Sequence, residues 1–148
     1  MKKLLLCILI CFLAGDSKAQ KMSLEIIGTA PDFNYTTISD YEQPKVASNA
    51  IKLKVDTKWR SYQIEFRSDG QIRTSSGQSI PAEKFFLRLQ NTFRLIPLSA
   101  TDDRLLLSRD RYDRDDETYY VDFIVAPLYY DYDPGSYVVN ILFTLTSD

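Results

Sequence analysis

The side chains that could do chemistry in this chain are carboxylates, tyrosines, lysines and serines, because the sequence contains no histidine. Without histidine, the Ser-His-Asp and Cys-His forms of nucleophilic catalysis are excluded, and so is every metal site with a histidine ligand. Serines are frequent, but none lies in the Gly-x-Ser-x-Gly sequence that presents a nucleophile on a strained turn. The sequence therefore predicts a protein that is not an enzyme and that uses no cofactor.

One stretch of carboxylates could bind a cation. Segment 110–117 holds five carboxylates in eight residues, and Ca²⁺ prefers a large set of hard oxygen ligands. Arg109, Arg111 and Arg114 lie among these carboxylates and compete for them, and the segment lacks the glycine and the ligand spacing of an EF-hand. We expect a solvated loop that binds no divalent ion tightly, with a Ca²⁺ site as the alternative.

Two further carboxylates, Asp131 and Asp133, flank a tyrosine and could act as the acid and base of glycoside hydrolysis. They also lie directly before Pro134 and Gly135, where aspartate is common because its side chain bonds to the backbone of a turn. We expect a turn here rather than a catalytic pair.

Aromatic side chains are the best candidates for contact with a partner or ligand. The chain has ten tyrosines and a single tryptophan, and many of the tyrosines lie in its last third. A tyrosine offers both apolar area and a hydroxyl, so a tyrosine-rich set of loops can stack on a sugar or contact a protein. The predicted contact residues are Trp59, Tyr119, Tyr129, Tyr130 and Tyr132.

The beginning of the chain has the organisation of a secretory signal peptide. Lys2 and Lys3 precede an apolar run at Leu4–Ala14, and Ser17-Lys18-Ala19 supplies the small residues that a signal peptidase reads. Eleven residues in a helix cover about 16 Å, whereas the hydrocarbon core of a membrane is about 30 Å thick. We therefore expect a signal peptide at 1–19, export to the periplasm or cell surface, and no membrane span in the mature domain at 20–148.

Both cysteines, Cys7 and Cys11, lie inside the predicted signal peptide, so the mature domain must fold without a disulfide. Its length suffices for one domain with a packed core. The net charge of the chain is −2, which gives no reason to expect nucleic acid as a partner.

Apolar and polar residues alternate with a period of two along the predicted domain, which indicates strands with one buried face. The clearest runs are 22–26, 51–55, 62–66, 121–125 and 137–145. The last run puts five apolar side chains on one face, and we expect it to form a central strand.

Turn sequences separate these runs. Ser68-Asp69-Gly70 is typical of a hairpin, and Asp133-Pro134-Gly135-Ser136 fits a type II turn. We expect a short strand at Tyr35–Ile38. Residues 79–84 could begin a helix, but the alternation from Phe85 onwards favours a strand from that point. The whole pattern predicts an all-β fold, an antiparallel immunoglobulin-like β-sandwich of roughly seven to nine strands, with a closed barrel as the alternative.

Several segments together are similar to a known group of proteins. Segments 48–55 and 62–66 are followed by Gly77-Gln78-Ser79-Ile80-Pro81, and the chain closes with Tyr132-Asp133-Pro134-Gly135-Ser136-Tyr137 and the threonine-containing run 141–146. In these features the chain resembles secreted immunoglobulin-like domains of Bacteroidota, of the fimbrial-subunit, spore-coat-U-like and WxL-like kinds. The resemblance implies a structural or adhesive role at the cell surface.

We therefore expect a secreted, non-enzymatic subunit or accessory of a pilus-like surface assembly, which meets a protein partner by pairing of edge strands. The alternative is a module that binds carbohydrate or a small ligand through the tyrosine-rich loops.

Overall fold

The computed structural model describes residues 22–28, 31, 33, 35–57, 60–110, 116–132 and 137–147. Within these residues the chain forms eleven strands, one short α-helix and one 3₁₀ helix. The predicted signal peptide at 1–19 and the predicted type II turn at 133–136 lie outside the described residues.

One layer is a five-stranded antiparallel sheet with the strand order β1-β2-β9-β6-β7. Its strands are β1 (Ser23–Gly28), β2 (Lys45–Asp56), β9 (Asp116–Val125), β6 (Phe85–Leu89) and β7 (Ile96–Pro97). Its inner face consists of apolar residues at alternate positions. Leu53 and Val55 on β2 and Val121 on β9 are fully buried.

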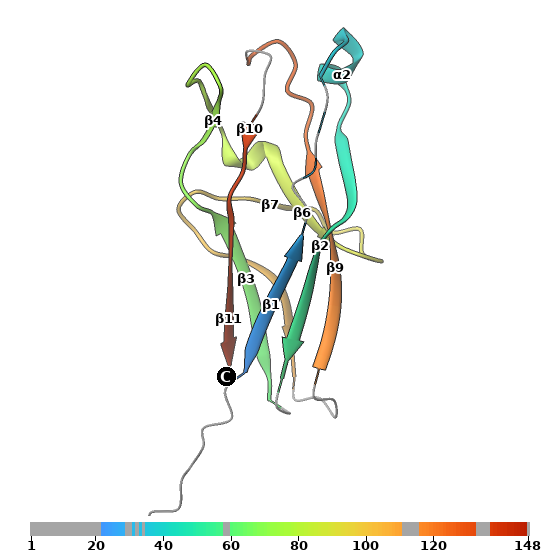
Figure 1. Ribbon diagram of the computed structural model, residues 1–148, viewed down its shortest axis with the longest axis vertical. Coiled ribbons are helices and arrows are strands. Elements are labelled where there is room, and N and C mark those ends of the chain that lie inside the picture. The colour runs from blue at the N-terminus through green and yellow to red at the C-terminus, as the bar shows by residue number, and fades with distance from the viewer. Residues whose placement is uncertain are drawn as a thin grey trace, which may run out of the picture.

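The opposite layer is a three-stranded sheet with the order β11-β3-β8. Its strands are β3 (Tyr62–Ser68), β8 (Arg104–Arg109) and β11 (Ile141–Ser147). On the central strand β3, Tyr62, Ile64 and Phe66 are fully buried, whereas the residues between them are half-buried. In Figure 1, β11 and β3 lie on the left, β2 and β9 lie on the right, and β1 crosses between them.

A third, smaller sheet continues the second layer. Its strands are β10 (Tyr137–Val138), β4 (Ile72–Thr74) and β5 (Ser79–Ile80), in the order β10-β4-β5. Because β10 pairs with β4 and β11 pairs with β3, the segment 137–147 runs past both small sheets. Gly70 connects β3 to β4 with a φ of 80°, but the two strands enter different sheets, so the predicted hairpin at Ser68–Gly70 was wrong.

The predicted strand at Tyr35–Ile38 was also wrong, because the helix α2 (Ile38–Glu42) begins there. The Asp40 carboxylate accepts the backbone N–H of Thr37 at 2.8 Å and that of Thr36 at 3.1 Å. The bond to Thr37, the residue that caps the helix, is one half of a capping box, and the bond to Thr36 fixes the residue before the cap. A threonine followed three residues later by an acidic residue is the local signal for this helix start.

The expected strand from Phe85 is present, and it follows the 3₁₀ helix η1 (Ala82–Lys84).

A β-bulge interrupts the pairing of β2 with β9 between Ala47 and Ile51. Asn49 lies in this bulge with a φ of 54°, and its backbone N–H donates to Oδ1 of Asp122 at 2.9 Å. Arg88 on β6 donates to Oδ2 of Asp122 at 2.7 Å. Asp122, which is only 6% exposed, therefore joins three adjacent strands.

The predicted all-β antiparallel sandwich is confirmed, and the described sheets keep separate edges rather than closing into one barrel. Four of the strands have only two or three residues, and the number of longer strands, seven, falls within the expected range of seven to nine.

The prediction that the C-terminal strand is central was wrong. β11 is an edge strand, because its only partner among the described strands is β3. Alternation reveals which face of a strand is apolar, but it does not reveal how many neighbours the strand has.

Candidate functional site

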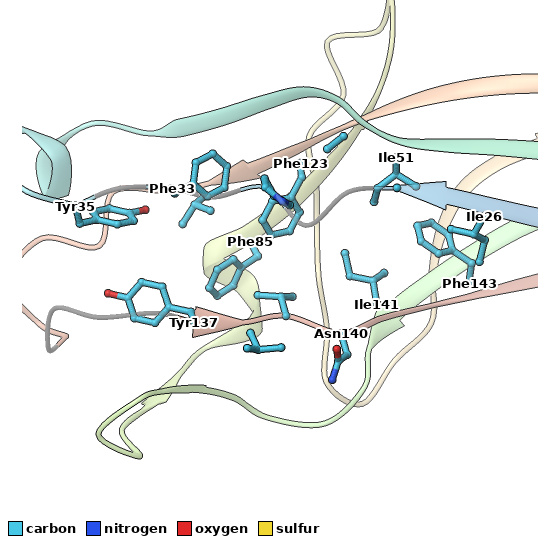
Figure 2. A pocket seen from close by; sticks show the side chains of 16 residues that line it. Ile26, Phe33, Tyr35, Ile51, Phe85, Phe123, Tyr137, Asn140, Ile141 and Phe143 are labelled. Atoms are coloured by element: carbon cyan, nitrogen blue, oxygen red, sulfur yellow. The ribbon is translucent and has the colours of Figure 1, made fainter.

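An apolar groove of about 430 Å³ lies between β1, the edge of the five-stranded sheet, and the segment β10–β11 at the edge of the other layer (Figure 2). We call this groove the seam. Strands β1, β2, β6, β9, β10 and β11 and the connection after β1 contribute to it. The residues that line it are Ile26, Gly28, Pro31, Phe33, Tyr35, Ala50, Ile51, Phe85, Phe123, Val125, Tyr137, Val138, Val139, Asn140, Ile141 and Phe143.

The seam is the open side of a core that is closed on its other side. Ile26 lines the seam, yet its residue surface is 48% exposed, and Ile141 and Phe143 are only half-buried. On the other side, where β7 and β8 form the edges, Leu98 is 0% and Leu106 is 4% exposed. The core is therefore more open along the seam than along this opposite side.

The floor of the seam is aromatic. The ring of Phe123 stacks between those of Phe33 and Phe85, with ring centroids 6.1 Å apart in each pair. None of the residues that line the seam carries a charge, and its polar side chains are Asn140 and the two tyrosines. The site therefore suits an uncharged occupant with apolar side chains.

A cluster of tyrosines forms one end of the seam, as Figure 2 shows for Tyr35 and Tyr137. The ring centroid of Tyr35 lies 5.0 Å from that of Tyr41 and 6.1 Å from that of Tyr137, and the Lys45 ammonium lies 5.5 Å from the Tyr35 ring. Burial raises the pKa of Tyr35 to about 12, and the neighbouring Tyr137 and Tyr41 hydroxyls add to the shift. The Tyr35 hydroxyl is therefore a neutral polar group at physiological pH.

Both walls of the seam are sheet edges. Among the described strands, β1 pairs only with β2, and β11 pairs only with β3, so one backbone edge of each has no strand beside it. Charged residues and prolines usually protect such edges. β7 contains Pro97, and β8 begins and ends with arginine, whereas the seven residues of β11 include no charge and no proline. β11 is thus a long edge without this protection.

The predicted contact residues fall at two separate places. Tyr119 lies near the start of β9, whereas Tyr129, Tyr130 and Tyr132 follow its end. Tyr129 and Tyr130 lie beside α2, because they form hydrogen bonds with Tyr41 and Glu42. The last six residues of β9, 120–125, lie between these two places along the chain, so the tyrosines do not form one surface. Trp59 lies outside the described residues.

The tyrosines beside α2 are the accessible ones. Tyr129 and Tyr130 are 49% and 65% exposed, and Tyr132 is half-buried against the core. The backbone N–H of Tyr129 donates to the carbonyl of Tyr41 at 2.9 Å, and the hydroxyl of Tyr130 donates to Glu42 at 3.0 Å. Tyr129 has a φ of 50°, which a bulky residue rarely adopts. These contacts place both exposed rings next to the tyrosine end of the seam.

Tyr119 has a structural environment. The hydroxyls of Tyr62 and Tyr119 lie 2.6 Å apart, and both donate to the Glu117 carboxylate. Arg109 donates from Nε to the Tyr119 hydroxyl at 3.2 Å. Burial raises the pKa of both tyrosines, and the hydrogen bonds to Glu117 raise it further. Because Tyr62 is on β3 and Glu117 on β9, this cluster ties the two layers together.

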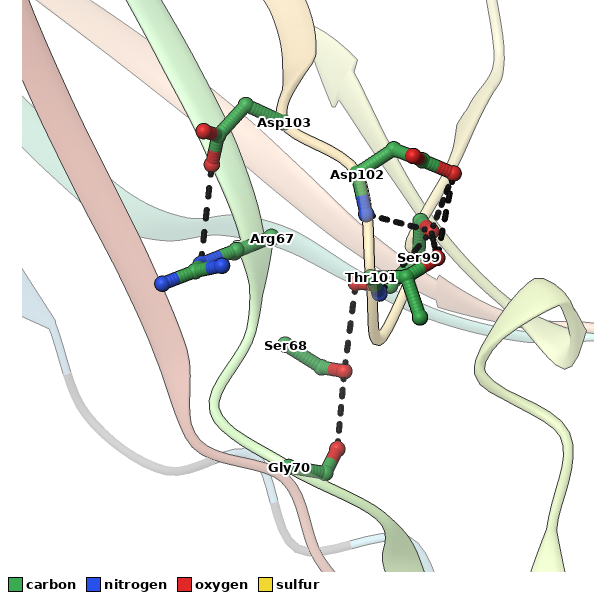
Figure 3. A network of polar contacts seen from close by, with 7 residues as sticks. All are labelled: Arg67, Ser68, Gly70, Ser99, Thr101, Asp102 and Asp103. Atoms are coloured by element: carbon green, nitrogen blue, oxygen red, sulfur yellow. Dashed lines mark hydrogen bonds and ion pairs between the residues drawn. The ribbon is translucent and has the colours of Figure 1, made fainter.

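A second polar network lies on the closed side, where the chain turns from β7 to β8 (Figure 3). The Ser99 hydroxyl accepts the backbone N–H of Asp102 at 3.0 Å, and the Ser99 carbonyl accepts the backbone N–H of Ser68 at 2.9 Å. The Ser68 hydroxyl donates to the carbonyl of Gly70 at 3.0 Å. Both serines are buried, so these bonds supply the partners that buried polar groups need.

The carboxylates that could bind a metal or cleave a glycoside are only partly described. Residues 111–115 of the acidic segment and Asp133 lie outside the described residues, and Asp131 is exposed. Within the described part of the chain, no group of three or more candidate ligands is close enough to hold a metal ion. The described helices are also too short and too polar to cross a membrane.

Sequence reasoning missed most of the seam. The alternation of apolar residues that starts at Tyr137 was visible in the sequence, but Phe33 and Tyr35 lie in a connection without periodicity. Ile26 belongs to the site only because the fold brings it to the same groove as β11. Comparison with protein-family models and with curated proteins gives no match for this chain.

Proposed function

We propose that this protein is an exported structural or adhesive subunit of a cell-surface assembly, and that it joins other proteins by accepting an extended strand at the seam. The observation that carries the proposal is an open apolar core between two sheet edges. An extended peptide meets both requirements of such a site, because its side chains cover the apolar floor while its backbone pairs with the free edges. The resemblance to secreted immunoglobulin-like subunits and the predicted signal peptide support the same role.

A carbohydrate-binding or small-ligand module is the second candidate. The observation that favours it is the exposure of Tyr129 and Tyr130 beside Tyr41, whose ring packs against Tyr35 of the seam. Exposed tyrosine rings can stack on sugars. However, a sugar also needs several hydrogen-bonding groups, and the seam offers few of them.

Thermal unfolding with added peptide tests the proposed function. The probe is a capped peptide in which valine alternates with threonine, with a lysine at each end for solubility. It should raise the melting temperature, because a ligand that binds only the folded state at a hundred times its Kd stabilises that state by about 2.7 kcal/mol. A peptide of the same composition with contiguous valines should have a much smaller effect.

Two variants locate the binding. Ile26→Lys places a charge in the seam and should abolish the stabilisation. Val46→Lys is the matched control, because Val46 has the same 48% exposure but does not line the seam. If oligosaccharides stabilise the protein while the alternating peptide does not, and if Tyr129→Ala and Tyr130→Ala remove the effect, then the second candidate is correct and the first is wrong.

A further inference from the structure

We infer that the strand received at the seam is β11 of a second copy of this chain, so that two copies join through β11 about a two-fold axis. This inference rests on the proposed function, since it names the partner for the same site. It is carried by the charges of the sheet edges, by the direction of the side chains on β11, and by the outer backbone edge of that strand, beside which no described strand lies.

The first argument concerns charge. When a strand pairs with a copy of itself about a two-fold axis, the two strands are antiparallel, and the first residue of one lies opposite the last residue of the other. Charges of the same sign at the two ends of the strand therefore face each other and repel. β8 would place Arg104 opposite Arg109 of the copy, and β1 would bring two copies of Glu25 close together. β11 has no charged residue and meets its copy without repulsion. Of the longer edges that the structure describes, it is the one suited to self-pairing.

The second argument concerns the side chains. A strand added beside β11 continues the three-stranded sheet, and its inward residues point to the same side as those of β11. Ile141, Phe143 and Leu145 are half-buried now, and the same row on the second copy would cover the open core beside them. The symmetry makes this cover mutual, because each copy presents its row to the seam of the other.

The third argument shows why a strand is a better occupant of the seam than the acyl chain of a lipid, which is also apolar. An acyl chain could fill the seam, but it would leave the backbone N–H and C=O groups at the outer edge of β11 without partners from the occupant. A second β11 forms a hydrogen-bonded ladder along this edge. Seven residues exceed the length of an average strand in a folded protein, so the ladder is long enough to hold two copies together.

A cysteine scan along the exposed face of β11 tests the geometry. The background is the full-length chain with Cys7→Ala and Cys11→Ala, which leaves no other thiol. Single cysteines then replace Leu142, Thr144 and Thr146, the exposed residues at alternate positions of β11. In an antiparallel two-fold pair, equivalent Cα atoms two residues from the axis are about 14 Å apart, which is too far for a disulfide.

If the axis passes through one of the substituted positions, oxidation should form a covalent dimer of that variant alone. If it passes between two neighbouring substituted positions, only a mixture of those two variants should form the covalent dimer. The remaining positions should give none. Phe93→Cys is the control, because Phe93 is 99% exposed in a loop away from the seam and should give only background dimer. Equal cross-linking at every position, or as much at position 93, would show non-specific contact and would overturn the inference.

The mass in solution is the second readout. Light scattering on the parent protein should give twice the monomer mass, and Leu142→Lys should halve it, because it would add a positive charge to each of the two paired strands. Leu142 is 41% exposed, so this change leaves the core intact, and circular dichroism checks the fold. A parent that stays monomeric at every concentration overturns the second copy as partner. If that monomer is still stabilised by the alternating peptide, the proposed function stands without this inference, and if it is not, both fail.

Discussion

At the scale of single residues, tyrosine hydroxyls supply much of the polar chemistry inside this sandwich. Tyr62 and Tyr119 share the Glu117 carboxylate between the two layers, and Tyr35 lies against other tyrosines at the end of the seam. Each ring contributes apolar packing, while its hydroxyl finds a polar partner or stays neutral. Because burial raises the pKa of all three tyrosines in the folded state, the loss of their protons favours the unfolded state.

This linkage predicts a loss of stability in alkali. A group whose pKa is higher in the folded state than in the unfolded state contributes stability that is complete below the unfolded pKa. For Tyr35 that contribution is complete below about pH 10 and is lost as the pH rises through about 12. Tyr35→Phe cannot ionise, so its free energy of unfolding should fall less steeply above pH 10, as measured by urea titration at each pH.

The variant should still lose some stability in alkali, because Tyr62 and Tyr119 keep their raised pKa values. Tyr120→Phe controls for the removal of a hydroxyl as such, since Tyr120 lies on the outer face of the five-stranded sheet and is 39% exposed. An unchanged slope in Tyr35→Phe would mean that Tyr35 ionises equally well in both states.

At the scale of elements, the bulge in β2 depends on one carboxylate. Asp122→Ala would leave the Arg88 guanidinium and the backbone N–H of Asn49 without their acceptor. Asp122 is buried but the Arg88 side chain is 32% exposed, so the loss should lower the free energy of unfolding by about 2–3 kcal/mol. Chemical denaturation measures this, with Asp103→Ala as the control, because Asp103 pairs with Arg67 at 3.6 Å on the surface and should matter by less than about 1 kcal/mol.

The backbone of the same bulge gives an independent check. Asn49 has a positive φ, which glycine adopts without cost and alanine does not. Asn49→Gly should therefore be close to neutral, whereas Asn49→Ala should cost about 1 kcal/mol. Equal losses for the two changes would show that the side chain of Asn49, and not its backbone, maintains the bulge.

At the scale of the whole molecule, the core is asymmetric, and stability should follow that asymmetry. Ile64 and Ile141 are the same residue type on neighbouring strands, but Ile64 is fully buried and Ile141 faces the seam. Ile64→Ala should cost about 3–4 kcal/mol, and Ile141→Ala only about 1 kcal/mol, when unfolding is measured at low protein concentration. Comparable losses would mean that the open side of the core is covered in solution.

The architecture could be predicted from local patterns further than the site could. The alternation around Tyr62, Ile64 and Phe66 defined a buried strand, and the structure confirms it. The site depends on distances between segments far apart in the chain, such as Ile26 and Phe143, and no local pattern reports those. The tyrosines looked like one cluster because they are close in sequence, but β9 separates Tyr119 from the others.

The positions of the strand ends have a mechanical consequence. The start of β1 and the end of β11 lie at the same end of the molecule, at the bottom of Figure 1, and both are edge strands. A pull on these two ends would peel each strand from its neighbour and break the ladder one hydrogen bond at a time. A pull transmitted along a strand paired with β11 would instead load many hydrogen bonds at once in shear. In a surface assembly under drag, the molecule would therefore resist force through its partner better than through its own termini.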